Sequence, residues 1–159
     1  MREIQTRFEI ESGEPAFVMT RVFDAPRCLV FETWTNSEYV PRWMLGPPGW
    51  TMPVCEIDLR VRGPWRFVWR HADGSEMEMR GVYREIEPPA RLVTTEAWGG
   101  DWPETLNTLR LDEEPSGTIM TQRVLYPSPE ARDAALETGM KEGVAMSLDR
   151  LARLLQTLT

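Results

Sequence analysis

Residues 128–158 read SPEARDAALETGMKEGVAMSLDRLARLLQTL. Ser128 is suited to cap a helix, Pro129 to occupy its first turn, and Glu130 to face the positive end of the helix dipole. Apolar residues then recur at spacings of three and four, which is the pattern of one helical face. They are Leu136, Met140, Val144, Leu148, Leu151, Leu155 and Leu158. We therefore predict one long C-terminal helix, from about Ser128 to Leu158.

The stretch from Met52 to Tyr126 has a period of two instead, which is typical of strands with one buried face. Glu56 to Arg62 alternates in this way, and so does the segment that contains Trp65, Phe67 and Trp69. Turn signals separate the alternating segments, namely Gly63-Pro64, Asp73-Gly74, Pro88-Pro89 and 113–117. The pattern predicts a meander of about six antiparallel strands.

The N-terminal part adds a strand and two short helices. Residues 14–23 read as a strand, after which Asp24 is a suitable N-cap before Pro26. Asn36-Ser37 starts a second short helix, which ends before the loop Gly46-Pro47-Pro48-Gly49. This order of elements predicts a single two-layer α+β domain over residues 1–159, with the last helix across the sheet.

The composition excludes several classes of protein. The formal net charge is -7, which disfavours nucleic acid and anionic membranes because both attract basic proteins. The N-terminal residues lack the apolar core of a signal peptide, and we therefore expect a cytoplasmic protein. Cys28 and Cys55 lie in separate predicted elements. A disulfide between them is compatible with the sequence, but a reducing compartment favours two free buried thiols, which is the state we expect. We expect a monomer or a homodimer.

Few residues have the chemistry of a catalytic or metal site. His71 is the only histidine, and it precedes an Asp-Gly turn where we expect it to be exposed and dispensable. One histidine and two separated cysteines do not form a zinc site, and no phosphate-binding loop is present. We therefore predict no metal, no cofactor and no catalytic residue.

The acidic residues of two predicted strands alternate with apolar residues, which predicts ion pairs with arginines on the outer face. They are Glu56, Asp58, Glu76 and Glu78.

The apolar faces of the strands point to one side, which the last helix must cover. We predict a cavity there, lined by Phe67, Trp69, Met77, Met79, Tyr83, Met120, Met140 and Val144. An ordinary packed core explains the same residues, since tryptophan and methionine are common core residues. Asn107 and Gln122 share faces with apolar residues, and they either orient a ligand or form buried amides with local partners.

Several segments resemble one known family. They are Val22-Phe23-Asp24-Ala25-Pro26, Trp34-Thr35-Asn36, Arg42-Trp43-Met44-Leu45-Gly46-Pro47, Glu56-Ile57-Asp58-Leu59-Arg60, and residues 81–89 followed by Arg91-Leu92-Val93. From about Phe17 to Leu155 the chain resembles the superfamily of START lipid-transfer domains and polyketide cyclases. It is most similar to the Hsp90-ATPase-activator-like group. The resemblance implies a helix-grip fold, in which a curved antiparallel sheet, two short helices and a long C-terminal helix enclose a cavity.

The resemblance also implies where the cavity opens. By analogy with relatives, its entrance lies near the loop from Trp43 to Trp50, so both tryptophans are added to the predicted ligand site. Two positions depart from the family pattern. Gly143-Val144 stands where members often have Gly-Trp, and Trp43-Met44 stands where they often have paired aromatics. The smaller residues are expected to enlarge or reshape the cavity.

Three functions are compatible with these patterns. The first is a binding protein for a hydrophobic or amphipathic small molecule, lipid-like or aromatic, held in an internal cavity. The second is an enzyme of the polyketide cyclase or hydrolase type that acts without a metal, although the sequence shows no convincing acid–base pair. The third is a chaperone-interacting module, which only the resemblance to the Hsp90 activator suggests.

Overall fold

A computed structural model describes residues 5–159. Its strands are β1 Arg7–Ile10, β2 Ala16–Phe23, β3 Trp50–Ile57, β4 Pro64–His71, β5 Glu76–Glu87, β6 Arg91–Glu96, β7 Thr105–Glu114 and β8 Gly117–Leu125. Its helices are α1 Arg27–Thr35, α2 Val40–Trp43, α3 Pro129–Leu136 and α4 Met140–Leu158. The predicted order of elements is confirmed, and β1 is an additional strand that the sequence analysis did not identify.

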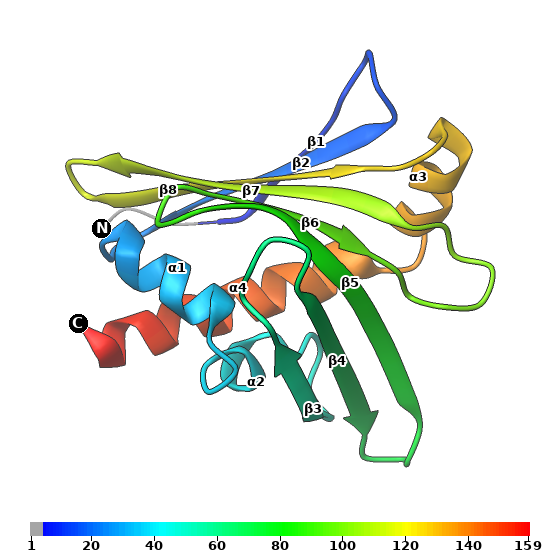
Figure 1. Cartoon of the computed structure of the whole chain (residues 1–159), viewed down its shortest axis with the longest axis horizontal. Coiled ribbons are helices and arrows are strands. Elements are labelled where there is room, and N and C mark those ends of the chain that lie inside the picture. The colour runs from blue at the N-terminus through cyan, green and yellow to red at the C-terminus, as the bar shows by residue number, and fades with distance from the viewer. Residues whose placement is uncertain (1–4) are drawn as a thin grey trace.

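The strands form one antiparallel sheet in the order β1-β2-β8-β7-β6-β5-β4-β3. The sheet is strongly curved, and α4 crosses its concave side together with α1 and α2 (Figure 1). A bulge in β5 shifts the register with β6 between Tyr83 and Glu85, which bends the sheet at this point. The helix-grip architecture that the resemblance implied is confirmed.

The C-terminal segment differs from the prediction, because it forms two helices instead of one. The side chain of Ser128 accepts a hydrogen bond from the Ala131 amide at 3.1 Å and caps α3 as expected. However, α3 ends at Leu136, and Gly139 adopts a left-handed conformation (φ 82°) before α4 begins. A single glycine tolerates this conformation, so the chain changes direction there while the apolar spacing continues across the break.

Two further boundaries differ from the prediction. Pro26, not Asp24, is the N-cap residue of α1, and no side chain caps that helix. Only the first two residues of the alternating segment 56–62 are in a strand, because β3 ends at Ile57 and the chain then turns. Leu59 and Val61 are 42% and 54% exposed as a result. Both thiols are free, but Cys28 is exposed instead of buried.

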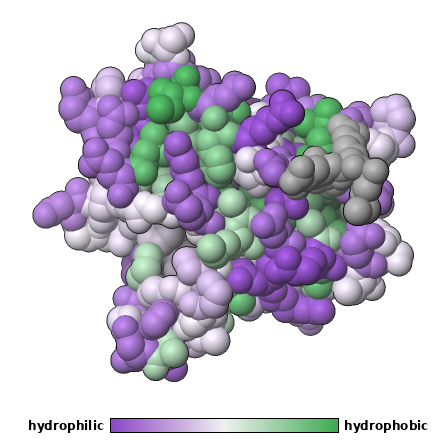
Figure 2. Space-filling model, turned by 180° about the vertical axis from the view of Figure 1, so that it is seen from behind, coloured by the Kyte–Doolittle hydropathy of each residue, from purple (hydrophilic) through white to green (hydrophobic). Residues whose placement is uncertain are grey.

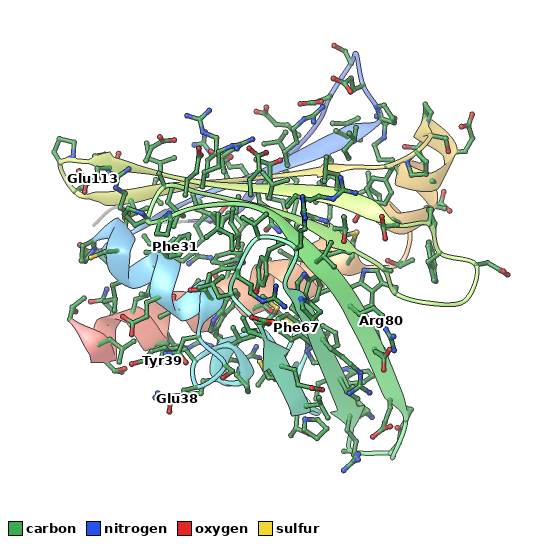
Figure 3. The ribbon with its side chains drawn as sticks, in the orientation of Figure 1. Phe31, Glu38, Tyr39, Phe67, Arg80 and Glu113 are labelled. Carbon is green, nitrogen blue, oxygen red and sulfur yellow. The ribbon has the colours of Figure 1, made fainter. Side chains whose placement is uncertain are left out.

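The core lies between the concave face of the sheet and the helices. Helix α4 contributes a stripe of buried residues, which are Ser147, Leu148, Leu151, Leu154 and Leu155. Phe67 of β4 lies on the side of the sheet that faces the helices (Figure 3). The outer face of the sheet carries charged side chains, such as Arg66 with Glu56 and Glu78. The side of the molecule that lies behind the view of Figure 1 is mostly hydrophilic, with separate hydrophobic patches (Figure 2). No helix within residues 5–159 is long and apolar enough to cross a membrane.

Candidate functional site

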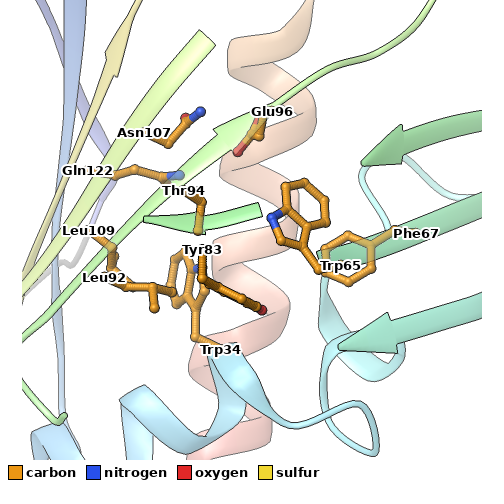
Figure 4. Close-up of a pocket in the computed structure, with 10 residues that line it drawn as sticks. All are labelled: Trp34, Trp65, Phe67, Tyr83, Leu92, Thr94, Glu96, Asn107, Leu109 and Gln122. Carbon is orange, nitrogen blue, oxygen red and sulfur yellow. The ribbon is translucent and has the colours of Figure 1, made fainter. Parts of the chain in front are cut away.

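A small cavity lies between the concave face of the sheet, the end of α1 and the aromatic residues of β4 and β5 (Figure 4). Its volume is about 40 Å³. This volume has room for roughly three water molecules, because a single water molecule needs about 10–15 Å³ of cavity volume. The lining residues are Trp34, Trp65, Phe67, Tyr83, Leu92, Thr94, Glu96, Asn107, Leu109 and Gln122.

One wall of the cavity is polar, although it belongs to the buried face of the sheet. Thr94 of β6 pairs directly with Asn107 of β7, and Glu96 follows two residues later on the same face of β6. Gln122 of β8 pairs with Leu109 of β7. Because side chains alternate between the two faces of a sheet, this register places the four polar side chains together on the concave side.

Two polar atoms in this cavity have no hydrogen-bond partner among the described residues. The side-chain amide of Asn107 donates to Thr105 Oγ1 at 2.9 Å, but its Oδ1 atom is unpartnered. The indole Nε1 of Trp65 is also unpartnered, and it points into the space between the lining side chains (Figure 4). Both residues are deeply buried, with 3% and 4% of their surfaces exposed. Buried polar groups in proteins are almost always satisfied by protein groups or by ordered water, so these two atoms mark positions where a water molecule or a polar group of a ligand binds.

Glu96 is the acidic group of the cavity. Burial raises the pKa of its carboxyl group from 4.5 to about 7. No hydrogen bond or ion pair joins this carboxyl group to another described residue, and burial without a partner disfavours its charged form. Nearby, burial and the charge of Glu96 raise the pKa of the Tyr126 hydroxyl to about 12. The pKa of the Tyr83 hydroxyl is also raised well above its usual value, mainly by burial and to a smaller extent by the charge of Cys55.

The other wall is aromatic and continues toward the surface. The ring centroids of Trp65 and Phe67 are 4.9 Å apart, and those of Phe67 and Trp69 are 6.0 Å apart. Trp98, in the loop after β6, stacks on Trp69 with centroids 5.4 Å apart. We call these four residues the aromatic ladder. It runs from the cavity to Trp98, which is 39% exposed.

The loop after α2 meets the aromatic ladder at Trp69, whose indole nitrogen donates to the Met44 carbonyl at 2.7 Å. Helix α4 holds the same loop in place. Arg150 donates to the carbonyls of Trp43 and Gly46, each at 3.0 Å, and Ser147 Oγ accepts from the Gly46 amide at 2.8 Å. This loop and the loop of Trp98 therefore come together at the outer end of the aromatic ladder.

The structure brings together only part of the predicted site. Phe67, Tyr83, Asn107 and Gln122 line the cavity. Val144 and Met140 are half-buried on α4 and lie outside the lining. The sulfur of Met140 accepts a hydrogen bond from the Tyr126 hydroxyl at 3.8 Å. The remaining predicted residues also lie outside the lining, namely Trp43, Trp50, Trp69, Met77, Met79 and Met120.

Those six residues have different positions. Met79 and Met120 belong to the packed core, and Trp43 is buried with its indole nitrogen bonded to the Thr33 carbonyl at 2.9 Å. Trp69 is part of the aromatic ladder, and Trp50 packs on His71. Met77 is 44% exposed, so the expectation that it faces an interior is wrong. It pairs with Trp69 near the end of the β4–β5 hairpin, where the sheet extends beyond the helices (Figure 1).

The sequence analysis did not predict two of the four residues of the polar wall, Thr94 and the acid Glu96. Leu92, Thr94 and Glu96 stand two residues apart on β6, so they share a face, and the apolar Leu92 indicates which face that is. This signal was present in the sequence. Trp34 was not foreseen either, because it reaches the cavity from the last turn of α1 by packing against Trp43 at a centroid distance of 4.7 Å.

Two other predictions concern residues outside the cavity. The outer-face ion pairs are confirmed, since Arg66 binds Glu56 at 3.1 Å and Glu78 at 2.9 Å. His71 is less exposed than expected, because its ring packs on Trp50 at a centroid distance of 4.9 Å. Within residues 5–159, no group of histidine, cysteine and acidic side chains is arranged to hold a metal ion.

Comparison with known proteins is consistent with this architecture. The family model described as Activator of Hsp90 ATPase homolog 1-like protein matches residues 24–156. The chain belongs to this family. None of the curated proteins matches the chain.

Solved structures of several bacterial proteins have the same fold. A Rhodobacter sphaeroides protein is 29% identical, with a TM-score of 0.88 over 94% of this chain and 98% of that chain. A Nitrosomonas europaea protein is 24% identical, with a TM-score of 0.82 over 92% and 97% of the two chains. An AHSA1-like protein from Aeromonas hydrophila is 18% identical, with a TM-score of 0.70 over 90% and 93%. The last two show the shared fold alone.

Proposed function

We propose that this chain binds a hydrophobic or amphipathic small molecule in the cavity between its sheet and its helices. The observation that supports the proposal is the pair of unpartnered polar atoms, Asn107 Oδ1 and Trp65 Nε1, in a cavity that has one polar wall and one aromatic wall. Ligand sites commonly combine an apolar lining with a few convergent polar groups that fix orientation.

The volume of the cavity sets a condition on binding. At about 40 Å³ it is much smaller than the roughly 300–1,000 Å³ of sites for larger organic ligands. A ligand must therefore displace side chains as it enters. The aromatic ladder is the natural route, because it joins the cavity to the surface and ends at the exposed Trp98.

A second candidate function is catalysis, which Glu96 favours. A carboxyl group with a pKa near 7 is suited to both donate and accept a proton at neutral pH. It lies in a cavity next to unpartnered hydrogen-bonding groups, which is a common arrangement at functional sites. Under this alternative, Glu96 is the general acid–base of a cyclase- or hydrolase-type reaction on a bound hydrophobic substrate.

Fluorescence titration with N-phenyl-1-naphthylamine, a neutral apolar probe, tests binding in the cavity. We expect saturable binding to the full chain and a loss of at least tenfold in affinity for Thr94→Phe, which adds a ring to the cavity. Thr108→Phe is the matched control, because Thr108 lies on β7 beside Asn107 and faces the other side of the sheet. Leu92→Phe is a second variant that fills the cavity.

Thermal unfolding of each variant shows whether it is folded, since overpacking costs about 1–3 kcal/mol. Equal affinities for the wild type and both filled variants would place the probe elsewhere and contradict the proposal. Absence of binding to the wild type would contradict it directly.

A further inference from the structure

The ligand that fits this cavity is constrained by the two unpartnered atoms, which have opposite hydrogen-bonding roles. Trp65 Nε1 is a donor only, and Asn107 Oδ1 is an acceptor only. Each belongs to a side chain that is more than nine-tenths buried. A ligand that satisfies both atoms must accept one hydrogen bond and donate another.

We propose that the cavity selects a neutral aromatic compound that carries a hydroxyl or carboxamide group, which accepts from Trp65 Nε1 and donates to Asn107 Oδ1. This inference rests on the proposed function and specifies its ligand class. A carboxylate accepts from Trp65 but offers no donor to Asn107. An ammonium group donates to Asn107 but offers no acceptor to Trp65. A plain hydrocarbon leaves both buried atoms unsatisfied, which is unfavourable.

The cavity supplies further support for a group that both donates and accepts. Glu96, Thr94 and Gln122 line the same polar wall, and none of their side chains has a hydrogen-bond partner among the described residues. Amide, hydroxyl and neutral carboxyl groups all adapt to a hydroxyl or carboxamide, because each can donate and accept. A bound anion would meet the Glu96 carboxyl group in the same small space.

The aromatic part of the proposal comes from the opposite wall. Trp34, Trp65, Phe67 and Tyr83 present rings to the cavity (Figure 4). Aromatic rings pack favourably against one another in stacked or edge-to-face arrangements. The volume of about 40 Å³ accommodates the polar group, and the ring of the ligand then lies against the aromatic ladder after side chains move outward.

The experiment compares compounds that share one ring and differ in its substituent. Calorimetric or NMR titration of the full chain is carried out with phenol, benzamide, benzoate, benzylammonium and toluene. We expect phenol and benzamide to bind about tenfold more tightly than toluene, and benzoate and benzylammonium to bind more weakly than phenol. Toluene binding as tightly as phenol, or benzoate or benzylammonium as the preferred compound, would overturn the inference.

Two variants assign the preference to the named atoms. Trp65→Phe removes the indole donor and Asn107→Leu removes the amide acceptor, and each is expected to lower the ratio of phenol to toluene affinity about five- to tenfold. Trp69→Phe is the matched control for loss of an indole, because the Trp69 donor is already satisfied by Met44. It should change both affinities equally. Unchanged ratios in both cavity variants would refute the assignment.

The outcomes also separate this inference from the proposed function. If toluene and N-phenyl-1-naphthylamine bind but no preference for phenol exists, the chain is a ligand-binding protein and the inference about the polar group is wrong. If none of the ring compounds and not even the naphthylamine probe binds, both are wrong.

Discussion

The indole of Trp98 stacks on that of Trp69, with ring planes only 15° apart. The two residues come from different parts of the chain, since Trp69 lies on β4 and Trp98 follows β6. Their contact covers the outer end of the aromatic ladder, where the loop after α2 also meets Trp69. If ligands enter along the aromatic ladder as proposed, they must pass this stacked pair.

The first prediction concerns Trp98. Trp98→Ala removes the outer ring of the stack, and we expect the association and dissociation rates of N-phenyl-1-naphthylamine to rise several-fold in stopped-flow measurements. The equilibrium affinity should change much less, because Trp98 does not line the cavity. Trp102→Ala is the control, since Trp102 is a 46% exposed tryptophan of the same loop. Equal effects of the two substitutions would show that the ladder is not the route of entry.

The second prediction concerns the pH dependence of stability. The pKa of Glu96 is about 7 in the folded protein against an ordinary value of 4.5. Below pH 4.5 the carboxyl group is neutral in both states, so it contributes no difference. Between pH 4.5 and 7 the unfolded chain loses this proton first, and folding becomes less favourable as the pH rises. Above pH 7 the penalty is constant at about 3 kcal/mol.

Glu96→Gln removes this penalty. We therefore expect the variant to have nearly wild-type stability at pH 4 and a free energy of unfolding higher by up to about 3 kcal/mol at pH 8. Urea unfolding of both proteins across this range measures the difference, in which the other titrating groups largely cancel. A difference that does not grow with pH would show that Glu96 titrates normally.

Much of the fold was predictable from local patterns. Period-two alternation located most of the strands, and Ser128 with Pro129 marked the start of the C-terminal helical segment. The break at Gly139 was not predictable from spacing, because Leu136 and Met140 remain four residues apart across it. Likewise, the alternation of Ile57, Leu59 and Val61 resembles a strand. The end of strand β3 is visible only in the structure, where Ile57 and Trp65 are the last residues that pair between β3 and β4.

The candidate site was harder to predict than the fold. Asn107 and Gln122 stood out because polar residues occupied apolar positions of two strands. Glu96 is likewise a polar residue at an apolar position of a strand, but an acidic residue at the end of a strand is usually exposed. In the structure Glu96 is half-buried and lines the cavity, whereas Met140 and Val144 lie outside the lining. Sequence spacing records which face a residue occupies, and it does not record how far the opposite layer lies.

The third prediction tests how α4 holds the loop after α2. Arg150→Ala removes the two hydrogen bonds to the carbonyls of Trp43 and Gly46. We expect faster hydrogen–deuterium exchange in residues 44–49, because the loop retains fewer contacts with α4. Arg153→Ala is the matched control, since Arg153 is exposed on the same helix. Unchanged exchange in the Arg150 variant would mean that other contacts, such as Ser147 with Gly46, are sufficient.

The fourth prediction concerns the ion pair between Arg21 of β2 and Asp149 of α4, which joins the sheet to the helix. The side chain of Arg21 is only 5% exposed, and its Nε atom has no hydrogen-bond partner among the described residues. Among the described residues, Asp149→Ala leaves the buried guanidinium group with a long hydrogen bond to the Thr6 hydroxyl at 3.3 Å and the Phe23 ring, whose centroid lies 5.4 Å away. Loss of a partner for a buried polar group costs about 1–3 kcal/mol, so we expect a decrease of that size in the free energy of unfolding.

Glu56→Ala is the control for this ion pair. Glu56 binds Arg66 on the outer face of the sheet, where its side chain is 65% exposed and Arg66 retains Glu78 as a second partner. Exposed ion pairs contribute little, because water screens the charges and can solvate the partner that remains. Urea unfolding at neutral pH should therefore show a much smaller effect for Glu56→Ala than for Asp149→Ala. Equal losses would mean that burial of Arg21 does not strengthen its dependence on Asp149.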